Sequence, residues 1–290
     1  MLQAHLQLEK INAKYAILPG DPKRIDTIKN FLDNPVELMY NREFRSVEGT
    51  YKGLPVIAVS TGVGGSSASL AVEELHNLGV HTMVRIGSAG ALQKNINLGD
   101  LIIGEGAIRD DGVSKTYVDS IYPAAPDHEV LEAIVKICKE KGYPYHTGII
   151  HSHETFYHDS NAEEENKWSK LGVLGADFES AGLFVVGRIR GCRCASILNN
   201  VVLYGQDSSE AVSDYQSGES LTSIGEKREI EVALEAFLKL ENLWKEITKI
   251  SFFYLIINTL FLFNLWIIKQ NSQNRNNMIF YKCKRYHITS

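Results

Sequence analysis

The sequence places glycine, proline and arginine together directly after its first apolar run, in the segment LPGDPKR. Gly20 lets the backbone approach a ligand closely, and Pro22 suits the first turn of a following helix, where its missing amide hydrogen is not needed. The amides at the start of that helix favour an anion, and Arg24, one turn further on, can bind the same anion through a forked pair of donors. Although G-D-P alone is also a common turn sequence, this spacing predicts a phosphate-sized site.

Two later segments repeat this arrangement. STGVGGSSAS, residues 60–69, follows an apolar run and opens a helical pattern, and MVRIGSAGAL, residues 83–92, places Arg85 inside an otherwise apolar stretch. A buried cation is costly unless a partner compensates its charge. Arg85 therefore either binds the same anion or forms a structural salt bridge.

The elements that must position these loops follow an alternating pattern. Short apolar runs alternate with helical patterns up to about residue 241, which is typical of a doubly wound α/β domain. Several runs are apolar throughout, as expected for central strands covered on both faces. The predicted strands are residues 15–18, 55–60, 82–87, 100–104, 146–151 and 194–202.

Two helices are indicated by their apolar periodicity. In DHEVLEAIVKICKEKG, Asp127 can cap a helix whose apolar residues fall on one face. In GEKREIEVALEAFLKLEN, four apolar residues form one stripe. The stripe consists of Ile230, Leu234, Phe237 and Leu238. We place the domain at residues 1–241 and treat residues 242–290 as an atypical hydrophobic extension.

The extension has an unusual composition. Residues 250–268 form a run of 19 without a charge, long enough to span a bilayer and followed by cations. Residues 250–290 contain no Gly, Ala, Val, Asp, Glu or Pro, while Ile, Phe, Tyr, Asn and Lys occupy 24 of the 41 positions. A tail anchor, an amphipathic interface segment, and AT-rich DNA translated after read-through or a frameshift are the open interpretations. A membrane contact is expected only if the tail is genuine.

Composition limits the class of protein. A chain of 290 residues, 44% of them hydrophobic, can bury a large core. The net charge of -5, with its cations scattered, gives no reason to expect nucleic acid as a partner. The four cysteines show no metal or disulfide spacing, and the N-terminus lacks the pattern of a secretory signal. We therefore expect a cytoplasmic protein with a small-molecule ligand.

Several motifs, in this order and spacing, resemble the nucleoside phosphorylase family, and its uridine phosphorylase branch more than its purine branch. The motifs are LPGDPKR, NREF, STGVGG with SLAVEEL, RIGSAGAL, SHETFY and ADFESA. The resemblance covers about residues 5–241 and implies a single-domain α/β/α sandwich around a mixed, partly barrel-like sheet. It also implies a homo-oligomer, a hexamer built as a trimer of dimers with shared active sites, that uses phosphate to cleave a nucleoside into a free base and (deoxy)ribose 1-phosphate.

The resemblance assigns roles residue by residue. The phosphate-binding residues are matched by Gly20, Arg24, Arg85, Ser88 and, from the neighbouring subunit, Arg42. The sugar-binding residues are matched by Phe178, Glu179 and, again from the neighbour, His5, with Phe156 packing against sugar or base. The residue types alone also fit an ordinary surface histidine at position 5, a helix-capping acid at 179 and a core ring at 156.

Phosphorolysis suits these side chains. Because the sugar acquires oxocarbenium character, an enzyme gains most by fixing the phosphate dianion beneath C1′ and stabilising the departing base. The arginines fix the dianion, and Glu179 can accept hydrogen bonds from the ribose hydroxyls while its charge favours the cationic sugar. Phe156 or Tyr157 offers a stacking face. Arg85 and Glu179 are therefore the predicted catalytic residues.

The chemistry requires no metal and no cofactor, since inorganic phosphate is a co-substrate. His151, His153 and His158 lie close together in the sequence. However, the i, i+2 spacing of the first two fits one face of a strand about as well as a zinc pair. We therefore predict no metal site.

Base recognition departs from the family pattern. Uridine phosphorylases usually carry Gln-x-Arg shortly after the Phe-Tyr pair, but FYHDSNAEEENKW has neither residue. Purine-type members place an aspartate at the end of a late strand, where this chain has Val202 or Leu203. The candidate carboxamides for the uracil edge are Asn199, Asn200 and Gln206. Since adjacent strand residues point to opposite faces, at most one of the two asparagines is expected to face the base.

The favoured function is phosphorolysis of uridine by a pentosyltransferase of nucleoside salvage or catabolism, and the alternative is a purine nucleoside phosphorylase. A nucleosidase of the same fold uses water and has little reason to keep Arg24, Arg42 and Arg85. A non-catalytic nucleoside-binding protein would need a decayed site, whereas these arginines and Glu179 are intact.

Overall fold

The computed structural model describes residues 1–155, 157, 159–206 and 221–249. The chain divides into a compact unit, Met1–Leu240, and a second unit, Glu241–Ser290. Residues 241–249 of the second unit are helical. The hydrophobic segment 250–268 lies outside the described residues. Within the described part of the chain, no helix combines the length and the apolar character needed to cross a membrane.

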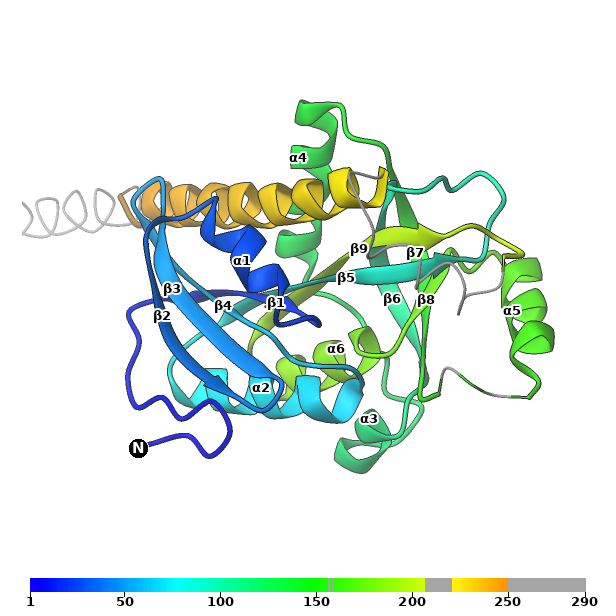
Figure 1. Cartoon of the computed structure of the whole chain (residues 1–290), viewed down its shortest axis with the longest axis horizontal. Coiled ribbons are helices and arrows are strands. Elements are labelled where there is room, and N and C mark those ends of the chain that lie inside the picture. Colours follow the sequence, from blue (N-terminus) through cyan, green and yellow to red (C-terminus); the bar gives the residue numbers. More distant parts are fainter. Residues whose placement is uncertain (156, 158, 207–220, 250–290) are drawn as a thin grey trace, which may run out of the picture. The chain divides into compact units, whose positions relative to one another are not determined.

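The first unit is built around a mixed sheet with the order β2-β3-β4-β1-β5-β8-β7-β6-β9 (Figure 1). Its strands are β1 Tyr15–Pro19, β2 Asp33–Asn41, β3 Phe44–Tyr51, β4 Leu54–Val59, β5 Thr82–Ala91, β6 Leu101–Asp110, β7 Tyr145–His153, β8 Gly175–Asp177 and β9 Arg193–Val202. The helices are α1 Arg24–Lys29, α2 Gly65–Asn77, α3 Val113–Tyr117, α4 His128–Lys141, α5 Asn161–Lys170 and α6 Ser180–Ile189. Residues 221–240 add a further helical segment.

One part of the sheet closes on itself. The last strand, β9, pairs in parallel with β5 and antiparallel with β6, while β5 also pairs antiparallel with the short strand β8. The ring β5-β8-β7-β6-β9 is therefore a small barrel attached to the open half of the sheet. The expected mixed, partly barrel-like sheet of an α/β domain is confirmed.

Helices cover both faces of the sheet. Figure 1 shows α1, α4 and the helical residues 221–240 on one side, with α2, α3 and α6 on the other. The fully buried strand β1 serves both layers, because Tyr15 and Ile17 belong to the first core cluster while Ala16 and Leu18 belong to the second. This alternation explains why the run YAIL has no polar face.

The two periodic helices form as expected. Asp127 accepts a hydrogen bond from Val130 N at 3.1 Å, and Gly142 ends α4 in the left-handed region at a φ of 67°. In the helical residues 221–240, Ile230, Leu234 and Phe237 are fully buried. Leu238 packs against the same cluster and is partly buried.

Sequence periodicity missed β2, β3 and β8. The side chains of β2 are mostly exposed, and the strand contains Pro35 and an irregular register, so it carries no run of buried residues. Its neighbour β3 alternates irregularly and includes Gly49. With three residues, β8 is too short for any periodicity to register.

Candidate active site

A cavity of about 850 Å³ opens where several strands end. Its walls include the loop after β1, the ends of β5, β8 and β9, and residues of α5 and of the segment 221–240. This location brings the three glycine-bearing segments to one ligand-sized space, as loops at the ends of parallel strands commonly do.

Arg24 is held at one end of this cavity. It is 5% exposed, and its Nη2 donates to Ser88 Oγ at 2.7 Å. Its Nη1 donates to Glu229 Oε1 at 3.2 Å, and its Nε lies 3.3 Å from Glu226 Oε2. Arg24, Ser88 and Glu226 all line the cavity together with Gly20. The guanidinium is therefore oriented before any ligand binds.

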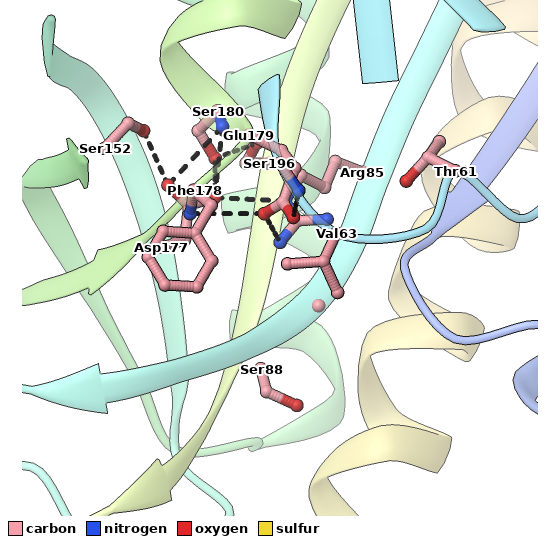
Figure 2. A network of polar contacts seen from close by, with 12 residues as sticks. Thr61, Val63, Arg85, Ser88, Ser152, Asp177, Phe178, Glu179, Ser180 and Ser196 are labelled. Carbon is pink, nitrogen blue, oxygen red and sulfur yellow. Dashed lines mark hydrogen bonds and ion pairs between the residues drawn. The ribbon is translucent and has the colours of Figure 1, made fainter. Parts of the chain in front are cut away.

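Arg85 lies beside Arg24 and is held by two acids. Its Nε donates to Asp177 Oδ2 at 3.0 Å, and its Nη2 forms an ion pair with Glu179. Figure 2 shows this guanidinium between the two carboxyl groups. Burial alone would lower the pKa of Arg85, but the charges of Glu179 and Asp177 outweigh it and the pKa is raised. Arg85 thus keeps its charge inside the protein.

One nitrogen of Arg85 has no hydrogen-bond partner within residues 1–155, 157, 159–206 and 221–249. Nη1 is buried and makes no hydrogen bond in the described part of the chain. A Cβ added to Gly20 would lie 4.0 Å from it, so Nη1 faces the Gly20 loop at the cavity wall. A Cβ at position 87 would lie 2.6 Å from Nη2, so Gly87 leaves room for the guanidinium in this position. A buried donor without an acceptor is costly, and a ligand oxygen would satisfy it.

Asp177 is the centre of the network in Figure 2. Besides Arg85, it accepts from Ser152 Oγ at 2.5 Å, from Ser180 Oγ at 2.6 Å and from Ser180 N at 3.1 Å. Ser180 in turn contacts Ser196 Oγ at 2.7 Å. These donors occupy both carboxyl oxygens of Asp177. Because they include Arg85 and Ser180, the first residue of α6, Asp177 fixes the position of the Arg85 side chain and of the start of this helix.

Glu179 lines the cavity and occupies the N-cap position of α6, but its side chain makes no capping hydrogen bond. Its Oε1 accepts from Gly64 N at 2.7 Å, and its Oε2 lies near Arg85. Gly64 has a φ of 100°, a conformation that favours glycine. Burial raises the pKa of Glu179, while the charge of Arg85 opposes this shift. Phe178, the adjacent predicted residue, also lines the cavity.

Two predicted residues lie away from this cavity. Arg42 is exposed in the β2–β3 turn with a φ of 55°. His5 is partly buried, and its Nδ1 lies 2.7 Å from Glu74 Oε1. Neither belongs to the described residues that line the cavity. Their roles stay a prediction that depends on a neighbouring subunit.

The predicted base-reading asparagines do not reach the cavity. Asn199 and Asn200 are completely buried, and their Nδ2 atoms donate to Thr222 O at 2.7 Å and to Asn97 O at 3.1 Å. Both side chains serve the core because β9 is buried on its two faces. The structure therefore corrects the expectation that one of them faces the base.

The other predicted base residues differ in their placement. Gln206 and Tyr157 line the cavity, although Tyr157 is 83% exposed and Gln206 Oε1 accepts from Leu203 N at 3.0 Å. Phe156 lies outside the described residues. Val202 and Leu203, which occupy the purine-type aspartate register, also line the cavity.

Three further polar side chains line the same cavity; the sequence analysis considered His153 only as a possible zinc ligand and missed Asn161 and Glu165. His153 stacks on His151 with ring centroids 4.9 Å apart, and burial lowers its pKa. On α5, Asn161 Nδ2 donates to Glu165 Oε1 at 2.9 Å, and burial raises the pKa of Glu165. The i, i+4 spacing of Asn161 and Glu165 was a usable signal, because it puts both on one helix face.

Glu226 and Glu229 were also missed. The helical segment was interpreted only through its apolar stripe, yet Glu229 lies four and seven residues before the buried Ala233 and Ala236. An acid on a buried helical face is the signal that would have found it. Glu229 is fully buried, and burial raises its pKa to about 8 against the opposing charge of Arg24.

The raised pKa of Glu229 predicts that the stability of the folded protein depends on pH. Since the pKa of Glu229 is about 8 in the folded protein and 4.5 ordinarily, the folded state binds this proton more tightly than the unfolded state. The free energy of unfolding is expected to fall between about pH 4.5 and 8, by up to about 1.4 kcal/mol per pH unit from this group. Urea unfolding at several pH values in this range should show that the free energy of unfolding depends less on pH in Glu229→Gln than in the wild type. The same pH dependence of the free energy of unfolding in the variant and in the wild type would contradict a raised pKa of Glu229.

A separate cluster has the composition of a metal site. Asp110, His151 and Glu164 each offer one potential ligand atom, and these atoms lie within 4.8 Å of one another. His151 Nε2 is already 3.2 Å from Asp110 Oδ2. His158, the third histidine weighed from the sequence, lies outside the described residues. The expectation that the reaction needs no metal therefore stays a prediction.

Comparison with known proteins places this geometry in a family. The family model described as the phosphorylase superfamily matches residues 14–212 of this chain. The chain belongs to the phosphorylase superfamily, which confirms the resemblance inferred from its motifs.

Individual relatives agree with this membership. The uridine phosphorylase of Escherichia coli K12 is 37% identical over 216 residues, covering 68% of this chain and 85% of that protein. The guanosine phosphorylase of Halorubrum lacusprofundi is 37% identical over 196 residues, covering 67% and 81%. A crystal structure of uridine phosphorylase from Vibrio fischeri, complexed with 6-hydroxy-1-naphthoic acid, is 41% identical, with a TM-score of 0.76 over 82% of this chain and 96% of that one.

Proposed function

We propose that this protein is a nucleoside phosphorylase that converts uridine and phosphate into uracil and ribose 1-phosphate. The observation that carries the proposal is Nη1 of Arg85, which has no partner among the described residues and is buried beside the Gly20 loop, close to Arg24 and Glu179. An oxyanion at this point would accept from Arg85 and lie within the cavity that Arg24 and Ser88 also line. A nucleosidase, which uses water, gives no reason for this arrangement.

The arrangement supports each part of the reaction. Phosphate held by the arginines attacks C1′ while the bond from C1′ to the base nitrogen breaks, and the departing base takes the electron pair. Positive charge develops on the sugar between these events, and Glu179 favours it electrostatically. The base is then protonated from solvent, so atoms and charge balance without a metal or a cofactor.

Uridine is favoured because relatives from several organisms carry the name uridine phosphorylase at 35–38% identity. The guanosine phosphorylase at similar identity keeps a purine substrate as the alternative. In place of the two core asparagines, we assign base recognition to Asn161 and Glu165, which line the cavity and pair with each other. A carboxamide donor beside a carboxylate acceptor complements a ring N–H beside a carbonyl, which uracil has.

The direct test incubates the full chain with uridine, thymidine, inosine, guanosine and adenosine, with and without phosphate, and with a chelator in parallel. Phosphate-dependent release of uracil, unaffected by the chelator, is expected. Release of hypoxanthine or guanine would instead identify a purine enzyme, and release without phosphate a nucleosidase. Nucleoside binding without turnover would indicate a binding protein. Loss of activity with the chelator would direct attention to Asp110, His151 and Glu164.

The proposal includes a cytoplasmic homo-oligomer, a hexamer with shared active sites, because Arg42 and His5 lie outside the cavity of their own subunit. Arg42→Ala and Glu179→Ala subunits should each be inactive alone. Mixed under subunit exchange, they are expected to recover part of the activity, since some sites would then combine two intact halves. Labelled subunits can verify the exchange, and no recovery despite proven exchange would exclude this arrangement.

A further inference from the structure

Two guanidinium groups face four carboxyl groups at the phosphate end of the cavity. Arg24 contacts Glu226 and Glu229, and Arg85 contacts Asp177 and Glu179. With these six groups ionised, two positive and four negative charges give a net charge of -2, and Lys23 and Asp21, which also line the cavity, offset each other. One further arginine from a neighbouring subunit would leave -1. A phosphate dianion would be repelled by such a site, so binding requires that part of this negative charge be neutralised.

Glu229 is the carboxyl group best placed to be neutralised. Its side chain is 0% exposed, whereas that of Glu226 is 16% exposed. Asp177 accepts from four donors, and Glu179 accepts from two backbone amides besides its ion pair. Among the described residues, Glu229 accepts only from Arg24 Nη1 and Gly87 N, both at 3.2 Å. The side chain of Asp177 is equally buried, but Glu229 has fewer and longer compensating contacts, which disfavours its charge.

The charged groups around Glu229 come from three elements. Arg24 of α1 and Arg85 of β5 favour the ionised form, while Glu226, on the same helical segment, opposes it. Burial outweighs these charges and raises the pKa of Glu229 to about 8. The carboxyl group of Glu229 therefore gains or loses its proton close to neutral pH, where enzymes commonly work.

We propose that Glu229 is a positioning residue that couples phosphate binding to the uptake of one proton, an inference that rests on the proposed phosphorylase function. Ionised Glu229 holds Nη1 of Arg24 and cancels the charge of this guanidinium. When the carboxylate takes a proton from solvent, Arg24 keeps its orientation through Ser88 and Glu226, and one of the two negative charges that offset its guanidinium is removed. Linkage is reciprocal, so bound phosphate also makes Glu229 harder to deprotonate.

The coupling predicts how phosphate affinity depends on pH. Above about pH 8 the unliganded site has lost the proton, and binding must restore it. The dissociation constant for phosphate is therefore expected to rise by up to about tenfold per pH unit in this range. The side chain introduced in Glu229→Gln cannot ionise. The phosphate affinity of this variant should therefore depend less on pH, and at pH 9 it should be higher than that of the wild type.

Calorimetry of the full chain can count the proton. Inorganic phosphate and sulfate are each titrated at pH 7.5, 8.25 and 9 in buffers of different ionisation enthalpy, which reveals protons taken from the buffer. Sulfate is included because it cannot itself be protonated in this range. Uptake approaching one proton per site at pH 9 is expected for the wild type, and none for Glu229→Gln. The matched control is Glu231→Gln on the same helical segment, where Glu231 contacts Lys141 and Tyr143.

The outcomes separate this inference from the function on which it rests. Phosphate binding with the same proton count in the wild type and in Glu229→Gln would overturn the role of Glu229 and leave the phosphorylase function intact. No phosphate binding by the wild type at any pH would overturn both. If the variant does not fold, the wild type decides alone, because binding of both anions without proton uptake at pH 9 contradicts the coupling.

Discussion

Arg85→Ala is expected to lower kcat/KM for phosphorolysis by about 10²–10³-fold, the usual loss when a preorganised donor to the reacting groups is removed. The reason is that, in the proposed reaction, the buried guanidinium would donate through Nη1 to the phosphate, while Nε and Nη2 are held by Asp177 and Glu179. Initial rates at several phosphate concentrations measure this effect. Near-normal turnover at saturating phosphate would remove Arg85 from the site.

The alanine variant also leaves Asp177 and Glu179 as buried charges without their partner, which destabilises a protein by about 3–5 kcal/mol. Arg85→Lys provides the control, because it keeps a cation near the two acids but loses the forked donors. We expect Arg85→Lys to fold, as checked by circular dichroism and thermal unfolding, and to need more phosphate for half-maximal rate. A folded Arg85→Lys enzyme with unchanged phosphate dependence would show that Arg85 serves structure alone.

Glu179→Gln is expected to lower kcat by about 10–100-fold, the equivalent of one charged hydrogen bond. The amide keeps the length of the side chain and an acceptor for Gly64 N, which lies 2.7 Å from Glu179 Oε1. It loses the negative charge that favours the cationic sugar. Single-turnover rates with uridine measure the chemical step directly.

A deoxynucleoside separates the two contributions of Glu179. If its carboxylate accepts from the ribose hydroxyls, the variant should lose less activity on 2′-deoxyuridine than on uridine, because part of the interaction is already absent. An equal loss on both substrates would mean that Glu179 acts only through its charge or through Arg85. An unchanged rate on both would exclude it from catalysis.

Local chemistry was predictable where a residue acts near its own chain position. Gly20, Arg24, Arg85 and Ser88 lie at the ends of apolar runs, and the structure brings all four to one cavity. The cap at Asp127 and the apolar stripe beyond Gly225 are likewise local patterns. Such features depend on side-chain type and on the period of one element, so the sequence contains them in full.

Contacts between distant elements were not predictable in this way. Glu229 is 205 residues from Arg24, and Ser152 is 25 residues from Asp177, yet each pair is joined by a hydrogen bond. Asn199 and Asn200 of β9 show the opposite situation. Their residue type suggested contact with the base, but both side chains are buried in the core. Which way a polar side chain on a central strand points depends on the layers packed against both faces.

The sequence by itself determined the family of this protein and the residues proposed for phosphate binding and catalysis, because these depend on glycine geometry, on helix starts and on the types of the charged residues. Only the tertiary structure decided the charge balance of the site. The closing of β9 onto β5 and β6, and the packing of the segment 221–240 beside α1, set which acids are buried next to which arginines. Burial and distance, which control both pKa and charge pairing, are properties of the folded chain.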